Sequence, residues 1–96
     1  MVNYEGVFIL DPDISAETTK TVMTQVQDMV TKLGGRIDGV QDWGKKRLAY
    51  KIRKKMDGYY FLLNFQLDSQ AASKLDSLLR VNDNVMRFLI VNKDDL

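Results

Sequence analysis

The sequence predicts an α+β domain of the ferredoxin-like type, with a four-stranded antiparallel sheet and two helices packed on one of its faces. Two observations predict it. Segments of alternating apolar residues occur four times, and segments with apolar residues at helical spacing occur twice. They follow one another as strand, helix, strand, strand, helix, strand, and the right-handed crossover rule leaves few other arrangements of that order.

Composition limits the kind of protein further. The chain has 96 residues, 45% of them hydrophobic, so we expect a single domain over residues 1–96 with a short polar tail from about residue 93. It has no cysteine and no histidine, so the commonest thiol nucleophile, general base and zinc ligands are missing. No apolar run approaches the roughly 18 residues that span a bilayer, and residues 1–5 do not resemble a signal peptide. We therefore expect a cytoplasmic protein without metal, cofactor, membrane contact or small-molecule substrate.

The first third of the chain predicts a strand and a helix. Residues 2–10 alternate, and Asp11-Pro12-Asp13 ends the strand because proline cannot donate a ladder hydrogen bond. Ser15 is the expected N-cap of a helix over about 15–33, and Gly34-Gly35 should end it because glycine accepts the left-handed conformation. The expected buried stripe of this helix is Val22, Val26, Met29, Val30 and Leu33.

The remaining elements follow in the same way. A long strand is expected over about 36–53, with a bulge or bend near Gly39 or Gly44 where the alternation changes phase. Met56-Asp57-Gly58 is typical of a hairpin turn, and residues 59–67 form the central return strand. A second helix to about residue 80 and a last strand over 85–92 complete the sheet. The buried stripe of the second helix is expected to be Ala71, Ala72, Leu75, Leu78 and Leu79.

The face of the sheet without helices should be exposed. An uncovered apolar patch of this kind usually marks an interaction site, so we expect a protein partner to bind there. The strand phases give six residues, called here the open-face patch: Val7, Ile9, Tyr60, Leu62, Leu89 and Val91.

Positive charge is concentrated in a basic stretch over residues 45–55. The net charge is only +1, yet this stretch holds seven of the 14 basic residues: Lys45, Lys46, Arg47, Lys51, Arg53, Lys54 and Lys55. Such a band beside the alternating apolar Leu48, Tyr50 and Ile52 indicates a docking surface for a polyanion. It is equally typical of a solvated edge strand that is protected against pairing, and charge patterning alone does not separate the two interpretations.

Two other kinds of site are less well supported by the residues. Aromatic side chains on the return strand are compatible with base stacking, but the glycine-rich signature of single-strand RNA readers is missing, which favours a core role. These side chains are Tyr59, Tyr60, Phe61 and Phe65. An acylphosphatase-like enzyme would need a phosphate-binding loop after the first strand, where Asp11–Asp13 is acidic. A ligand-sensing regulatory domain, or a homo-oligomer pairing through the sheet, remains an alternative.

Three segments match a known family. They are Gly44–Arg53, Tyr4-Glu5 and the run from Asp83 to Arg87. The first, a basic cluster followed by Leu48-Ala49-Tyr50, resembles the signature of the bacterial small-subunit ribosomal protein S6 family, and the resemblance covers the whole chain. It implies a ferredoxin-like fold and a ribosome-bound structural protein that is not an enzyme. It also implies binding to the central domain of the small-subunit ribosomal RNA together with ribosomal protein S18.

The resemblance also implies candidate RNA-binding residues. Lys45, Lys46 and Arg47 match the basic cluster of the family, and Arg87 matches a basic position that opens the last strand. Lys51 stands where the family often has proline. With the rest of the basic stretch, the expected RNA-binding residues are Lys45, Lys46, Arg47, Lys51, Arg53, Lys54, Lys55 and Arg87.

Overall fold

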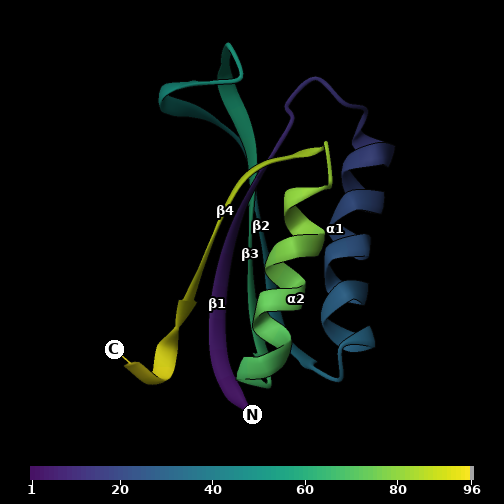
Figure 1. Ribbon diagram of the computed structural model, residues 1–96. Coiled ribbons are helices and arrows are strands. Elements are labelled where there is room, and N and C mark those ends of the chain that lie inside the picture. The colour runs from purple at the N-terminus through teal and green to yellow at the C-terminus, as the bar shows by residue number, and fades with distance from the viewer. Residues whose placement is uncertain (96) are drawn as a thin grey trace.

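The predicted ferredoxin-like fold is confirmed by a computed structural model, in which residues 1–95 are described. The elements are β1 (Val2–Leu10), α1 (Ala16–Lys32), β2 (Arg36–Ile52), β3 (Lys55–Leu67), α2 (Ser69–Arg80), β4 (Val85–Asn92) and the short 3-10 helix η1 (Lys93–Asp95). The strands form one antiparallel sheet in the order β2-β3-β1-β4, and both helices cover the same face (Figure 1). Leu96, at the end of the expected polar tail, lies outside the described residues.

The core lies between this face and the helices. The interior strands β1 and β3 contribute stacked aromatic pairs, Phe8 with Phe61 at 4.8 Å between ring centroids and Tyr4 with Phe65 at 5.6 Å. The predicted stripe of α1 packs against them, with its three valines fully buried. The prediction that Leu78 is buried is wrong, because its side chain is 42% exposed. Leu75 and Leu79 of the same predicted stripe are buried, Ala71 and Ala72 are partly buried, and residue 78 is turned by about 100° from residue 79.

The predicted ends of α1 are confirmed. The Ser15 hydroxyl accepts a hydrogen bond from the Thr18 amide at 3.1 Å, which satisfies one of the free donors of the first turn. At the other end Gly34 has φ +88°, and the amides of Gly34 and Gly35 donate to the carbonyls of Thr31 and Val30. This pair of bonds is a Schellman motif.

Among residues 1–95, no helix combines the length and apolar character that crossing a membrane requires.

The turn of the β2–β3 hairpin is not at Met56-Asp57-Gly58, as the sequence predicts. It lies at Arg53-Lys54, because Ile52 pairs with Lys55. Both turn residues have positive φ, 51° and 64°, which is the geometry of a type I′ turn. The prediction is wrong because arginine and lysine seldom adopt this conformation, so nothing in their side chains signals the turn.

Gly58 lies inside β3, where close packing explains the glycine. A Cβ atom added there would lie 2.4 Å from Cγ2 of Ile9 and 3.3 Å from Cδ2 of Leu48. We therefore expect Gly58→Ala to lower the free energy of unfolding by about 1–3 kcal/mol, measured by urea unfolding. Gly39→Ala is the control, since the nearest atom to an added Cβ there is 4.0 Å away. Equal urea midpoints for the two variants would contradict the packing explanation.

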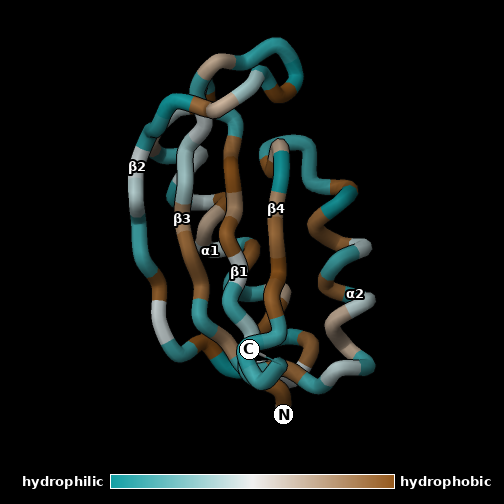
Figure 2. Tube along the Cα trace, turned by 90° about the vertical axis from the view of Figure 1, so that its left-hand side faces the viewer, coloured by the Kyte–Doolittle hydropathy of each residue, from teal (hydrophilic) through white to brown (hydrophobic). Residues whose placement is uncertain are grey.

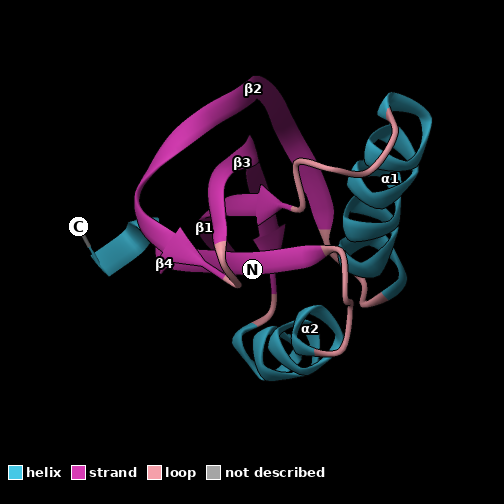
Figure 3. Cartoon of the chain, turned by 90° about the horizontal axis from the view of Figure 1, so that it is seen from above, coloured by secondary structure: helices cyan, strands magenta, loops and turns pink. Residues whose placement is uncertain are grey.

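Strand β2 is irregular and the sheet curves strongly. The sequence predicts a bulge or bend near Gly39 or Gly44, and register shifts occur at both places, between Ile37 and Gly39 and between Asp42 and Gly44. The end of the β2–β3 hairpin bends away from the helices and curls over the helix-free side of the sheet (Figures 1 and 3). The helix-free face is therefore flanked at one end by the basic hairpin.

Candidate nucleic-acid interface

The strand register brings the open-face patch together. Val7 of β1 pairs with Leu62 on one side and with Leu89 on the other. Ile9 pairs with Tyr60. Val91 pairs with Glu5, which is two residues before Val7 on β1 and therefore faces the same side of the sheet. The strand phases inferred from the sequence are therefore correct, and Figure 2 looks onto this helix-free side of the sheet. The role of the patch in partner binding stays a prediction.

Exposure is uneven across the patch. Leu89 is 63% exposed, whereas Val7, Ile9, Tyr60 and Val91 are half-buried. Leu62 is only 4% exposed, so the expectation that the whole face is open to water is wrong at this position. Leu62 lies on an interior strand between Val7 and Gln41, and both neighbours reduce its exposure. A groove of about 570 Å³ lies between β1 and β4, lined by Val7, Ile9, Arg87, Phe88 and Leu89.

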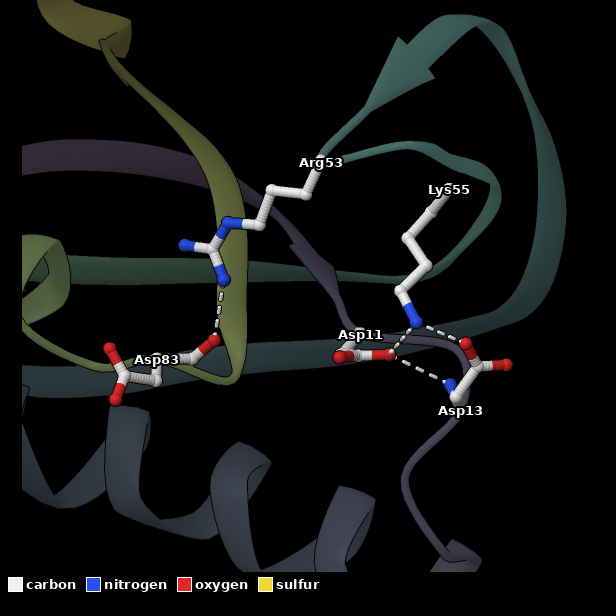
Figure 4. A network of polar contacts seen from close by, with 5 residues as sticks. All are labelled: Asp11, Asp13, Arg53, Lys55 and Asp83. Atoms are coloured by element: carbon white, nitrogen blue, oxygen red, sulfur yellow. Dashed lines mark hydrogen bonds and ion pairs between the residues drawn. The ribbon is translucent and has the colours of Figure 1, made fainter.

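Three of the eight candidate RNA-binding residues are engaged within the chain, and Figure 4 shows two of them, Arg53 and Lys55. Arg53 donates to the carbonyl oxygens of Asp83 at 2.7 Å and Val85 at 3.3 Å. The Lys55 ammonium lies between the carboxylates that flank Pro12. Arg87 donates to the hydroxyl of Tyr50, and its guanidinium carbon lies 5.6 Å from the centre of that ring. These contacts hold the curled hairpin against the start of β4 and the loop before α1.

The lysine contact is an ion pair with both aspartates of that loop. Lys55 Nζ lies 3.7 Å from Oδ1 of Asp11 and forms a hydrogen bond with Asp13. The bond to Lys55 lowers the pKa of Asp13 below 3.8, and the same bond raises the pKa of Lys55 above 10.5. Its contribution to stability is therefore present across neutral pH, and it is lost as the pH falls below 3.8 or rises above 10.5.

The other five candidate residues project from the hairpin into solvent. They are all exposed and form no ion pair with any of residues 1–95: Lys45, Lys46, Arg47, Lys51 and Lys54. Uncompensated cations on one projecting hairpin create a positive potential that attracts phosphates. The structure thus separates the predicted RNA-binding set into three residues that hold the hairpin and five that are available to a polyanion.

A bulge in β2 presents Trp43 at the start of the basic stretch. Asp42 fixes this bulge, because its carboxylate accepts hydrogen bonds from the Tyr59 hydroxyl at 2.6 Å and from the Gly44 amide at 3.0 Å. The indole N–H of Trp43 donates to Oε1 of Gln41 at 3.0 Å, and the side chain remains 42% exposed. Sequence reasoning did not include Trp43 among the binding residues. The available signal is its place two residues before Lys45, separated from the basic run only by Gly44.

The Asp42 contact predicts an unusual tyrosine titration. The bond to the carboxylate, together with partial desolvation, raises the pKa of Tyr59 to about 12. The stabilisation that comes from this contact is therefore fully present below pH 10 and is lost as the pH rises towards 12. An absorbance titration should show one of the four tyrosines ionising last. Asp42→Asn should remove this late phase and Asp38→Asn should keep it, whereas a late phase that survives Asp42→Asn would contradict the assignment.

Comparison with known proteins identifies the family. The family model for ribosomal protein S6 matches residues 3–92. The chain belongs to the ribosomal protein S6 family. It is 39% identical to the small ribosomal subunit protein bS6 of Clostridium novyi, over 98% of this chain and 99% of the relative. It is 40% identical to the bS6 of Moorella thermoacetica, over 99% of this chain and 97% of that relative.

A solved structure supports the same membership. The crystal structure of 30S ribosomal protein S6 from Thermotoga maritima superposes with a TM-score of 0.93 at 27% identity, covering 98% of this chain and 89% of that one. The resemblance seen in the sequence is thus confirmed. The relatives are ribosomal proteins of the small subunit, so the S6 chain is a ribosomal structural protein and the acylphosphatase-like alternative is excluded.

Proposed function

We propose that this S6 chain binds the central domain of the small-subunit ribosomal RNA together with ribosomal protein S18, on ribosomes in the cytoplasm. One observation carries the proposal. Five exposed basic residues project from the β2–β3 hairpin, and this hairpin curls over the same helix-free face that holds the open-face patch. A cationic surface that suits RNA therefore lies next to an apolar surface that suits a protein partner, so both can be bound at the same time.

In duplex regions of the RNA, we propose that the chain contacts phosphates and does not read the bases. Lys45, Lys46 and Arg47 lie on an exposed strand and not on a helix that could enter a groove, which favours backbone contacts. Neutralising phosphates releases counterions, so affinity should fall steeply as salt rises. A net charge of +1 is small for this role, so the isolated chain should bind RNA weakly.

The partner contact is proposed to supply the remaining affinity. Burying a few hundred Å² of apolar surface at roughly 25 cal/mol per Å² contributes several kcal/mol before the costs of association. Leu89, the most exposed member of the open-face patch, lies on the edge strand β4 and lines the groove beside Val7, so it is the member most available to a partner. Two linked binding events then raise the overall affinity without new contacts to RNA.

The test of the RNA contact is the salt dependence of binding. Replacing Lys45, Lys46 and Arg47 with alanine should weaken binding at low salt and reduce the slope of log affinity against log salt by about one unit per lost contact. Folding should be nearly unaffected, because surface changes usually stay within about 0.5 kcal/mol.

A charge-matched control separates local contacts from net charge. Replacing Lys20, Lys32 and Lys74 with alanine removes the same charge from exposed positions on the two helices. This control should keep most of the slope. If both triple variants lose the same slope, the hairpin is not the RNA contact and the basic stretch is a solvated edge.

A further inference from the structure

A pocket lies where the bulge of β2 meets β3, at the border between the basic stretch and the open-face patch. It has a volume of about 490 Å³ and is lined by Trp43, Lys46, Arg47 and Tyr60. Two of its walls are aromatic and two are cationic. Gly44 pairs with Tyr60 across the strands, and a Cβ atom at residue 44 would meet nothing within 4 Å. Gly44 has φ +74°, a conformation that favours glycine, so the bulge that carries Trp43 depends on the residue next to it.

The aromatic walls are held in place before any ligand arrives. The hydrogen bond from Trp43 to Gln41 orients the indole, and the two bonds to Asp42 hold the bulge from which Trp43 projects. Trp43 is not part of the core cluster and is 42% exposed, so core packing does not explain its size. A rigid and exposed aromatic ring offers contact area at little cost in conformational entropy.

We propose that this pocket binds an unpaired nucleotide of an RNA strand. The base would stack on Trp43 beside Tyr60, and Lys46 and Arg47 would bind the adjoining phosphate. The inference rests on the RNA binding proposed above and adds that part of the contact is made to a single strand. Stacking on aromatic rings beside a cationic track is how proteins hold unpaired bases without reading their sequence. An apolar protein side chain would contact only the aromatic walls, whereas a nucleotide also brings a phosphate to Lys46 and Arg47.

Trp43 is the only tryptophan of the chain, so its fluorescence reports on this pocket alone. We would titrate the full chain with a short oligouridylate and, separately, with inorganic polyphosphate of the same charge, and measure binding independently by competition with a labelled RNA. The oligouridylate should quench Trp43 as it binds, and polyphosphate should bind without quenching. Oligouridylate binding without quenching, or equal quenching by both probes, would overturn the stacking proposal and leave phosphate binding intact. No binding of any RNA would instead reject the proposed function itself.

Variants at Trp43 test the same inference by changing the protein and not the ligand. Trp43→Leu keeps an apolar side chain and removes the ring, so affinity for the oligouridylate should fall about tenfold. Affinity for a duplex RNA of equal charge should not change, and Trp43→Phe should bind the oligouridylate nearly as well as the natural chain. Circular dichroism would establish that both variants fold. A Trp43→Leu variant that binds the oligouridylate normally, or that loses both RNAs equally, would contradict the proposal.

Discussion

Replacing Phe61 with lysine should unfold the protein. Phe61 is fully buried on the helix side of β3 and stacks on Phe8 at the centre of the core. Truncating a buried phenylalanine alone costs about 3–5 kcal/mol, and the lysine adds the cost of burying an unpaired charge. The sum is comparable to the whole stability of a small domain, about 5–15 kcal/mol. Circular dichroism and urea unfolding measure the result.

The control at this position is Phe61→Leu, which keeps an apolar side chain. It should remain folded, with a loss of about 1–2 kcal/mol from the changed shape. A Phe61→Lys protein that folds and unfolds cooperatively in urea, as the natural chain should, would show that β3 does not turn this side towards the helices.

Replacing Leu89 with lysine should leave the domain folded and abolish binding to ribosomal protein S18. The Leu89 side chain is 63% exposed in the isolated chain, so the lysine keeps its ammonium in water and stability should change by no more than about 0.5 kcal/mol. In the complex the same ammonium would be buried against an apolar partner surface without an anion. Binding is measured by pull-down or calorimetry with purified S18.

Val81→Lys is the matched control for Leu89. Val81 is 77% exposed at the end of α2, away from the open-face patch, and carries a similar apolar side chain. It should bind S18 as the natural chain does. If Leu89→Lys binds S18 normally, or if both variants lose binding, the open-face patch is not the docking surface.

Much of the fold follows from local chemistry that the sequence displays. Ser15 and Gly34-Gly35 mark the ends of α1 because capping and the left-handed conformation each need particular residue types. Alternation along β3 separates Phe61 from Leu62 correctly, because the period of a strand leaves only two phases.

The errors concern features that depend on contacts between distant segments. Gly58 is a glycine because Ile9 packs against it, and the sequence alone makes it look like a turn residue. The real turn at Arg53-Lys54 has no glycine or asparagine to mark it. The burial of Leu62 follows from its position between two neighbouring strands, which strand phase alone does not reveal.

The sequence predicts the region of the candidate site better than it predicts the role of each residue in that region. Charge density marks residues 45–55, but it does not tell which cations meet partners within the chain. Arg53 and Lys55 bind groups about 30 and 42 positions away, and no local pattern indicates such pairs. The exposure of Trp43 depends on the bulge that Asp42 holds through Tyr59 of the neighbouring strand, and no local pattern reveals that contact.

The most direct test of the central claim is the affinity of the purified chain for a fragment of the central domain of small-subunit ribosomal RNA, measured with and without ribosomal protein S18. Joint binding through the hairpin and the open-face patch predicts weak, strongly salt-dependent binding by the chain alone and much tighter binding when S18 is present. Leu89→Lys should remove the gain due to S18 and keep the weak binding. Equal affinity with and without S18, or no binding even with S18, would contradict the account.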